Sequence, residues 1–511
     1  MTLTRKIVAG ASALAILAGA AGLSACGKAP PPPAAAPVAG KLMLTGVTVV
    51  DPRTGALTPN VSVLTDAGRI VAVGPGDLAP GDASVQRVDA SGKFLSPGFN
   101  DMHAHPLGDP APSGTLALLL ANGVTGFRQM QGSNELLQQR RDHRLPIGAQ
   151  APDLLIMPGA ILTPFNAGTP EMAVQTVRDQ KAAGADFIKI GMVSKPVLFA
   201  VLAEARKDNI LVAGHVPPSV DVVDAAQHGM HAIEHLGPSD GALVACSSRH
   251  DELRRELDAI PEKKGPPIKL PGAETLAQKM LARLIINPAV ATKPDDTRRR
   301  RELVESFDEA RCRQVARDLV KAGNWQVPTL IRRKSAEQAD DPAVHNDPNI
   351  RYIPPKTAAL WREVTAEYEK KVPADARQLY RADYALGLRA VKIFDEEGVP
   401  MLAGSDESGG WEVPGFSLHQ EFDELAKAGL SPLRILQMTT SDAAMFLGRQ
   451  DRMGQVAPGY VADLVLLDGD PTKAVANLHH VAGVVRAGTY YSAKDLDALK
   501  ERVAKGGGYL R

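Results

Sequence analysis

The sequence predicts an α/β fold: a (β/α)8 TIM barrel joined to a small β-sandwich domain that is built from both ends of the chain. Three observations predict it. Short apolar runs broken by Gly, Asp and Pro open the folded region and return near the C-terminus. Between them, strand-like runs alternate with helix-like stretches, which favours a parallel sheet. The 511 residues are enough for a barrel with insertions and a second domain.

The β-rich ends predict one domain assembled from two separate pieces of chain. LMLTGVTVVD, VSVLTDAGRIVAVG and SVQRVDASGKFL lie near the start, and GQVAPGYVADLVLLDGDP and VAGVVRAGTYYS lie near the end. Each reads as a short strand bounded by turn residues. We expect residues 41–97 and 450–511 to form the β-sandwich domain.

The middle of the chain, residues 98–449, is predicted to form the barrel. Residues 170–184 and 196–209 are typical of its helices. The eight expected strands are GFNDM, GVTGFRQM, LLIMPGA, DFIKI, LVAGH, HAIEH, QVPTL and VPMLAGS. Eight such units fit a barrel of ordinary size, although the alternation alone also fits a doubly wound sheet.

Long helical insertions interrupt this alternation at about 240–325 and 332–375. We expect them to form a lid or a side wall over a site. The first insertion carries four consecutive arginines, 298–301. The simplest interpretation is a solvated helix face, and the alternative is a role in binding a substrate carboxylate.

The N-terminus has the layout of an export signal. Residues 1–26 contain a basic start, an apolar run and small residues before Cys26, and LSAC resembles a bacterial lipobox. We therefore expect export, with a lipid on Cys26 anchoring the protein to a bacterial membrane in the periplasm, at the outer membrane or at the cell surface. An ordinary signal peptide is the alternative. The Pro- and Ala-rich residues 27–40 read as an extended linker.

Composition excludes some classes of partner and scaffold. Lys+Arg and Asp+Glu number 58 each, so a nucleic acid is not an expected partner. After Cys26 only Cys246 and Cys312 remain. Two cysteines cannot build a dense disulfide scaffold, although one bridge in an oxidising compartment stays open.

Polar residues that end apolar strands carry the functional signal. In a barrel, chemistry collects at the carboxyl ends of the strands. These ends hold His103, His105, Lys189, His215, His235 and Asp406. Imidazole and carboxylate are good ligands for zinc and similar ions, and alternation lets the histidines of HAH point to the same side. Each residue alone also fits a structural role, but the ordered set favours a metal site.

The same motifs resemble the amidohydrolase superfamily of metal-dependent hydrolases over roughly residues 42–492. The resemblance depends on PGFNDMHAH, GADFIKIG, AGHV, AIEHL, LAGSDE, LHQEFDELAKAGLSPLRILQMTTSDAAMFLG and GQVAPGYVADLVLLDGDP. The last two, with GRIVAVGP and SGKFLSPGF, are similar to the imidazolonepropionase-like and prolidase-like branch.

The resemblance implies a site for two divalent ions. His103, His105 and Asp406 would bind one ion, and His215 and His235 the other. Lys189 would bridge them as a carbamate formed with CO2, which explains a lysine amid apolar residues. Asp406 would take a proton from a metal-bridging hydroxide and pass it to the leaving amine. Zinc is the expected ion; Mn, Co and Fe also suit N and O ligands.

These roles imply a hydrolase of carbon–nitrogen bonds. The expected substrates are dipeptides or N-acyl or N-aryl amino acids, with catalytic roles for Asp406 and Lys189. A cyclic-amide or lactone hydrolase with the same binuclear site is the alternative, and a non-catalytic solute-binding lipoprotein is a more distant one. The resemblance also makes a homo-oligomer an expectation.

Overall fold

The computed structural model describes residues 40–238, 240–261, 280, 282–407 and 409–506. The predicted signal peptide, with Cys26, and nearly all of the predicted linker lie outside the described residues. In the described part of the chain, none of the helices combines the length and apolar character that a membrane span needs.

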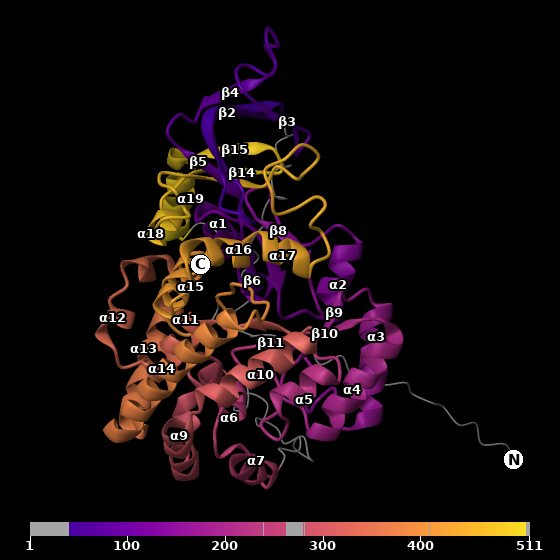
Figure 1. Ribbon diagram of the computed structural model, residues 1–511, viewed down its shortest axis with the longest axis vertical. Helices are drawn as coiled ribbons and strands as arrows, with labels where there is room; N and C mark the ends of the chain where they lie inside the picture. The colour runs from indigo at the N-terminus through magenta and orange to yellow at the C-terminus, as the bar shows by residue number, and fades with distance from the viewer. Residues whose placement is uncertain (1–39, 239, 262–279, 281, 408, 507–511) are drawn as a thin grey trace, which may run out of the picture.

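Strands from both ends of the chain form one eight-stranded mixed sheet, seen at the top of Figure 1 in indigo and yellow. Its order is β15-β14-β13-β5-β1-β2-β3, with β4 also paired to β1. The antiparallel pair β13–β5 joins the two halves, with Leu464 opposite Pro97. The strands are β1 (Leu42–Val50), β2 (Leu57–Asp66), β3 (Arg69–Gly74), β4 (Gln86–Asp89), β5 (Phe94–Pro97), β13 (Leu464–Leu467), β14 (Val481–Arg486) and β15 (Thr489–Ser492).

Seven parallel strands of the middle region form the barrel wall. They fall into two runs, β6-β7-β8 and β9-β10-β11-β12. Most of their residues are buried, as expected for parallel strands covered on both faces. The strands are β6 (Phe99–Ala104), β7 (Val124–Gln129), β8 (Asp153–Ile156), β9 (Phe187–Ile190), β10 (Leu211–Gly214), β11 (Ala232–Glu234) and β12 (Trp325–Val327).

Backbone hydrogen bonds continue across both gaps between the two runs. The N–H of Leu162 donates to the carbonyl of Lys189 at 2.9 Å. On the other side, the predicted eighth strand contributes one bridge, between Gln326 and Met401. The N–H of Met102 then donates to the carbonyl of Ala403 at 3.0 Å. The predicted barrel is confirmed, although its eighth strand is reduced to these few bonds.

Helices surround the barrel, and the predicted segments 170–184 and 196–209 are α3 and α4. Both begin after a residue that favours a helix start: the hydroxyls of Thr169 and Ser194 accept N–H groups of the first turn. The barrel helices are α1 (Pro112–Ala121), α2 (Asn134–Arg141), α3 (Pro170–Ala182), α4 (Lys195–Asp208), α5 (Val222–Gln227), α10 (Glu309–Lys321), α14 (Ala374–Glu396), α15 (Phe416–Lys427), α16 (Pro432–Thr439) and α17 (Ser441–Phe446).

The insertions add further helices, seen at the bottom and lower left of Figure 1. These are α6 (Gly241–Ala245), α7 (His250–Asp258), α9 (Pro294–Ser306), α11 (Leu330–Glu337), α12 (Pro342–His345) and α13 (Pro355–Lys371). Two helices, α18 (Ala476–His479) and α19 (Ala493–Ala504), belong to the C-terminal region. Short 3-10 turns lie at Pro106–Gly108, Pro288–Ala291 and Pro348–Tyr352.

The arginine run in α9 is not the fully solvated face that the sequence suggested. Arg298 and Arg301 are about half exposed and pair with surface carboxylates. The Arg300 side chain is only 16% exposed and pairs with Asp240 at 3.2 Å and with the buried Asp383. Because successive helix residues point in different directions, one member of the run can face inward. Arg300 therefore fastens α9 to α14 through a buried ion-pair cluster.

A covalent bond also links two parts of the chain that are distant in sequence. Cys246 and Cys312 form a disulfide bond, and both are fully buried. This resolves the pairing that the sequence left open.

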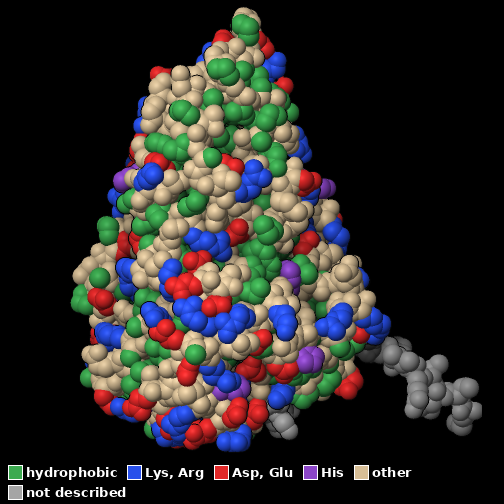
Figure 2. All heavy atoms as spheres, viewed as in Figure 1, with side chains coloured by type: hydrophobic (Ala, Val, Ile, Leu, Met, Phe, Trp, Pro, Cys, Tyr) green, Lys and Arg blue, Asp and Glu red, His purple; other side chains and the backbone are tan. Residues whose placement is uncertain are grey.

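Figure 2 shows Lys and Arg side chains interspersed with Asp and Glu over the lower, helix-covered part of the face in view. Mixed charge of this kind accords with the equal totals of 58 basic and 58 acidic residues.

Candidate metal centre

The two histidines of HAH lie at the carboxyl end of β6. His103 is 1% exposed, His105 lies just beyond the strand, and their ring centroids are 5.4 Å apart. The neighbouring segment approaches very closely here. A Cβ atom on Gly404 would lie 2.7 Å from the Cβ of His103, so only glycine permits this packing.

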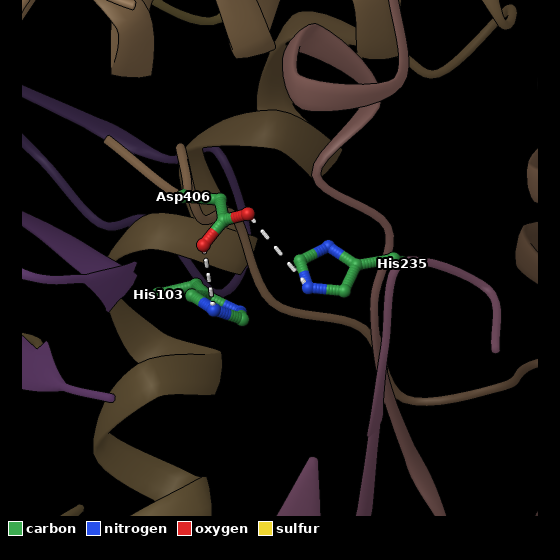
Figure 3. Close-up of side chains that lie close together, drawn as sticks. All are labelled: His103, His235 and Asp406. Carbon is green, nitrogen blue, oxygen red and sulfur yellow. Dashed lines mark ion pairs between the residues drawn. The ribbon is translucent and has the colours of Figure 1, made fainter. Parts of the chain in front are cut away.

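Asp406 is the point at which three of the predicted histidines meet. Its Oδ1 lies 3.0 Å from Nε2 of both His103 and His105. Its Oδ2 lies 3.8 Å from Nε2 of His235, as Figure 3 shows. Candidate ligand atoms of His103, His235 and Asp406 all lie within 4.8 Å of one another. Side chains from the first, sixth and eighth barrel segments therefore converge on one small volume.

His215 and His235 form the other side of this volume. Their ring centroids are 5.1 Å apart, and those of His235 and His103 are 4.8 Å apart. Nδ1 of His235 lies 2.6 Å from the hydroxyl of Thr329, which follows β12. The backbone φ angles of His235, Thr329 and Asp406 are all positive, at 59°, 44° and 57°. Such conformations cost about 1–3 kcal/mol each and cluster at functional sites.

Lys189 lies on β9 and is 2% exposed. Its Nζ is buried and makes no hydrogen bond within the described structure. Burial lowers the pKa of this amine to about 8, although the negative charges of Glu234 and Asp406 oppose the shift. Its side chain runs along Gly214 of β10, where a Cβ would lie 3.0 Å from the lysine Cδ. A buried amine with a lowered pKa and no partner is an unusual feature.

Burial holds three of the site's imidazoles, those of His105, His215 and His235, in the neutral form. Burial and the nearby Lys189 lower the pKa of His215 to about 3. Burial also lowers the pKa of His105, and lowers that of His235 well below its usual value. Because metal ligation uses the lone pair of a neutral ring, these histidines are in the form that binds a divalent ion.

A buried ion pair that was not predicted from the sequence supports His103 from beneath the site. Glu234 Oε2 lies 2.7 Å from Nδ1 of His103, and Glu234 Oε1 accepts a hydrogen bond from Nη2 of Arg128 at 2.8 Å. Burial alone would raise the pKa of Glu234, but the charge of Arg128 and the hydrogen bond with His103 outweigh it and hold the pKa well below its usual range. Glu234 therefore orients His103 with Nε2 toward Asp406.

A second buried carboxylate, Asp101, ties the first and eighth barrel segments together. It accepts hydrogen bonds from the N–H of His103 at 3.1 Å and from the N–H and hydroxyl of Ser405 at 3.0 and 2.6 Å. Burial raises its pKa to about 6. Asp101 and Glu234 carry the same sequence signal as Lys189, because each is an ionisable residue within a buried strand.

The six predicted residues thus lie around one volume, and their donor set fits divalent ions. Four imidazoles and one carboxylate offer N and O ligands of the kind that zinc and similar ions take. The buried Nζ of Lys189 has no hydrogen-bond partner among the described residues, which fits its modification to a carbamate held by bound ions. Asp240, Glu337 and Asp383 also lie close together, but Arg300 and Arg333 already pair with this second group.

Comparisons with known proteins also indicate a relationship to the amidohydrolases. The profile of the Amidohydrolase family matches residues 382–490, which include Asp406. A 5-methylthioadenosine/S-adenosylhomocysteine deaminase of Symbiobacterium thermophilum is 45% identical over 67 residues. That match covers 13% of this chain and only 15% of the deaminase, so it is a local likeness.

Solved structures extend the likeness to most of the chain. A bottromycin amidohydrolase is 23% identical, with a TM-score of 0.64 over 91% of this chain and 90% of its own. A putative prolidase from Bifidobacterium longum is 20% identical, with a TM-score of 0.57 over 91% of this chain and 100% of its own. At these identities the likeness shows a shared fold. With the family match, it confirms the resemblance to the amidohydrolase superfamily.

Proposed function

We propose that this chain, a member of the amidohydrolase superfamily, is an exported metal-dependent hydrolase that cleaves amide bonds of dipeptides or N-acyl or N-aryl amino acids. The observation that carries the proposal is the convergence of histidines and Asp406 beside the buried Lys189, whose Nζ has no hydrogen-bond partner among the described residues. Bound divalent ions would polarise the scissile carbonyl and lower the pKa of a water molecule.

Each of the six residues would bind one of the two ions or bridge both of them. His103 and His105 with Asp406 would hold one ion, and His215 with His235 the other. Lys189 would bridge them as a carbamate, formed when its neutral amine attacks CO2 and loses a proton. A pKa of about 8 leaves roughly 10% of the amine neutral at pH 7, against about 0.03% at the ordinary value. Burial therefore favours the step that makes the bridge.

Asp406 is placed to move the proton that the reaction requires. Its Oδ1 faces His103 and His105, whereas its Oδ2 lies on the side of His235. Oδ2 would accept a proton from the attacking water and deliver it to the leaving amine nitrogen. Glu234 and Thr329 orient the rings of His103 and His235, so the site is preorganised.

The proposed substrate class is supported by the similarity to a structure described as a putative prolidase. A panel of dipeptides, N-acyl amino acids, lactones and cyclic imides tests it. We expect linear amides with a free carboxylate to turn over. Turnover of the cyclic compounds alone would replace this proposal with the cyclic-amide or lactone alternative.

Export with a lipid anchor on Cys26 is part of the same proposal. The buried disulfide between Cys246 and Cys312 supports it, since such bonds persist in oxidising compartments. Metabolic labelling with a radioactive fatty acid tests the anchor. We expect label in the wild type and none in Cys26→Ala; equal labelling of both would count against a lipid on this cysteine.

A further inference from the structure

We infer that Arg332 binds the free carboxylate of the substrate's C-terminal amino acid, so that the enzyme selects amides that carry this carboxylate next to the scissile bond. The inference rests on the proposed function and makes it more specific. It assigns the substrate's carboxylate to one side chain, in the segment that follows β12.

Arg332 lies at the carboxyl end of the barrel, beside the proposed reaction centre. Its Nε lies 3.4 Å from Oδ2 of Asp406, the oxygen assigned to proton transfer. Nη1 donates to the carbonyl of Ile286 at 3.2 Å, and Nη2 donates to the carbonyl of Ile285. These bonds from the first insertion fix the guanidinium, whose side chain is 14% exposed. Arg332 is thus a preorganised cation at the site.

The positive charge of Arg332 is not cancelled once the site is loaded. Asp406 would then be engaged with an ion. Among the described residues, the other carboxyl group that pairs with Arg332 is Glu412, whose Oε1 lies 3.6 Å from Nη1 of Arg332. Burial raises the pKa of Glu412, which weakens this carboxyl group as a counter-charge to Arg332. An anion from the substrate would restore the charge balance at this point.

The distances also match the chemistry of an amino-acid leaving group. From the scissile carbonyl carbon, the chain runs through the amide nitrogen and Cα to the carboxylate carbon. The three bonds span at most about 4 Å. The substrate's carboxylate carbon would therefore lie within about 4 Å of the scissile carbonyl carbon. Nε of Arg332 lies 3.4 Å from Oδ2 of Asp406, so its guanidinium is close to the reaction centre. Planar guanidinium groups are well suited to carboxylates.

The other described cations near the six residues are not available for this role. Arg128 is fully buried beneath the site and is bound to Glu234 and to the carbonyl of Met102. Lys189 is assigned to the bridge between the ions. The sequence also offered the arginine run in α9 as an alternative binder of a substrate carboxylate, but Arg300 pairs with Asp383 and Asp240.

The test compares two substrates in each of four enzymes. One substrate is N-acetyl-leucine, or the best dipeptide of the panel, and the other is the amide of the matching amine, which lacks only the carboxylate. The enzymes are the wild type, Arg332→Met, Arg332→Lys and the control Arg313→Met, whose arginine pairs with Glu396 and Glu397 on the barrel exterior. Both substrates are assayed on one preparation, so the ratio of their kcat/KM values does not depend on the fraction folded.

We expect the wild type and Arg313→Met to prefer the carboxylate substrate. In Arg332→Met, kcat/KM for that substrate should fall roughly 10- to 100-fold relative to kcat/KM for the analogue, mainly through KM. Arg332→Lys should recover part of the loss. An unchanged preference in Arg332→Met, or equal use of both substrates by the wild type, would overturn the inference and leave the proposed function standing. Failure of the wild type on every linear amide would instead overturn both.

Discussion

Replacing Glu234 by Gln tests whether the ion pair beneath the site supports metal binding. The carboxylate lies 2.7 Å from Nδ1 of His103 and 2.8 Å from Nη2 of Arg128, and it is fully buried. Gln has the same shape, but it carries no charge and must turn an NH2 group toward one of these two donors. The substitution therefore weakens the orientation of His103 and leaves the charge of Arg128 unpaired.

The size of both effects follows from these contacts. Loss of an outer partner of a ligating histidine typically costs 10- to 100-fold in metal affinity, or about 1.4–2.8 kcal/mol. Breaking a buried ion pair costs about 3–5 kcal/mol, and Gln retains part of the hydrogen bonding. We therefore expect a loss of about 3 kcal/mol in the free energy of unfolding of the metal-free protein.

Competition with a chelator of known affinity measures the first effect, and urea unfolding measures the second. Glu204→Gln is the matched control, because Glu204 is also largely buried and accepts a hydrogen bond from Arg178, on the outside of the barrel. The control should lose some stability and keep its metal affinity. If Glu234→Gln also kept the wild-type metal affinity, the reasoning that Glu234 orients a metal ligand would be refuted.

Two further predictions concern stability. The double variant Cys246→Ser, Cys312→Ser should lose about 4 kcal/mol in urea unfolding, because the bond closes a loop with a sequence separation of 66 residues; a loss under about 1 kcal/mol would contradict this. His215 has a pKa of about 3 when folded and about 6.5 when unfolded, so its contribution is present above pH 6.5 and is lost as the pH falls toward 3. The metal-free protein should therefore lose about 2 kcal/mol from this group between pH 7 and 5, and His215→Asn should show a correspondingly shallower loss.

The barrel and the proposed ligands were predictable because their signals are local. Strand–helix alternation marks the parallel sheet, and a polar residue that ends an apolar run marks the functional end of each strand. Lys189 was predicted as a site residue because it lies within the apolar run of β9. The eighth segment was harder to predict, because its backbone bonds depend on Gln326 and Met102, which lie far away in the sequence.

The supporting residues and the insertions could not be predicted from local patterns. The role of Glu234 depends on its contacts with His103 and Arg128, each more than 100 residues distant. Arg300 sits in a run that looks solvated, and only the positions of Asp240 and Asp383 show that it faces inward. Contacts of this kind are set by tertiary packing, which overrides the appearance of a single helix.

Counting bound metal tests whether Lys189, modified to a carbamate, bridges two divalent ions. Elemental analysis of the wild type, of Lys189→Ala and of the control Lys181→Ala, an exposed lysine of α3, should be combined with amide-hydrolysis assays. We expect about two divalent ions per chain in the wild type and control, with metal and activity lost together in Lys189→Ala. One ion per chain in the wild type, with content and activity unchanged in Lys189→Ala, would contradict it.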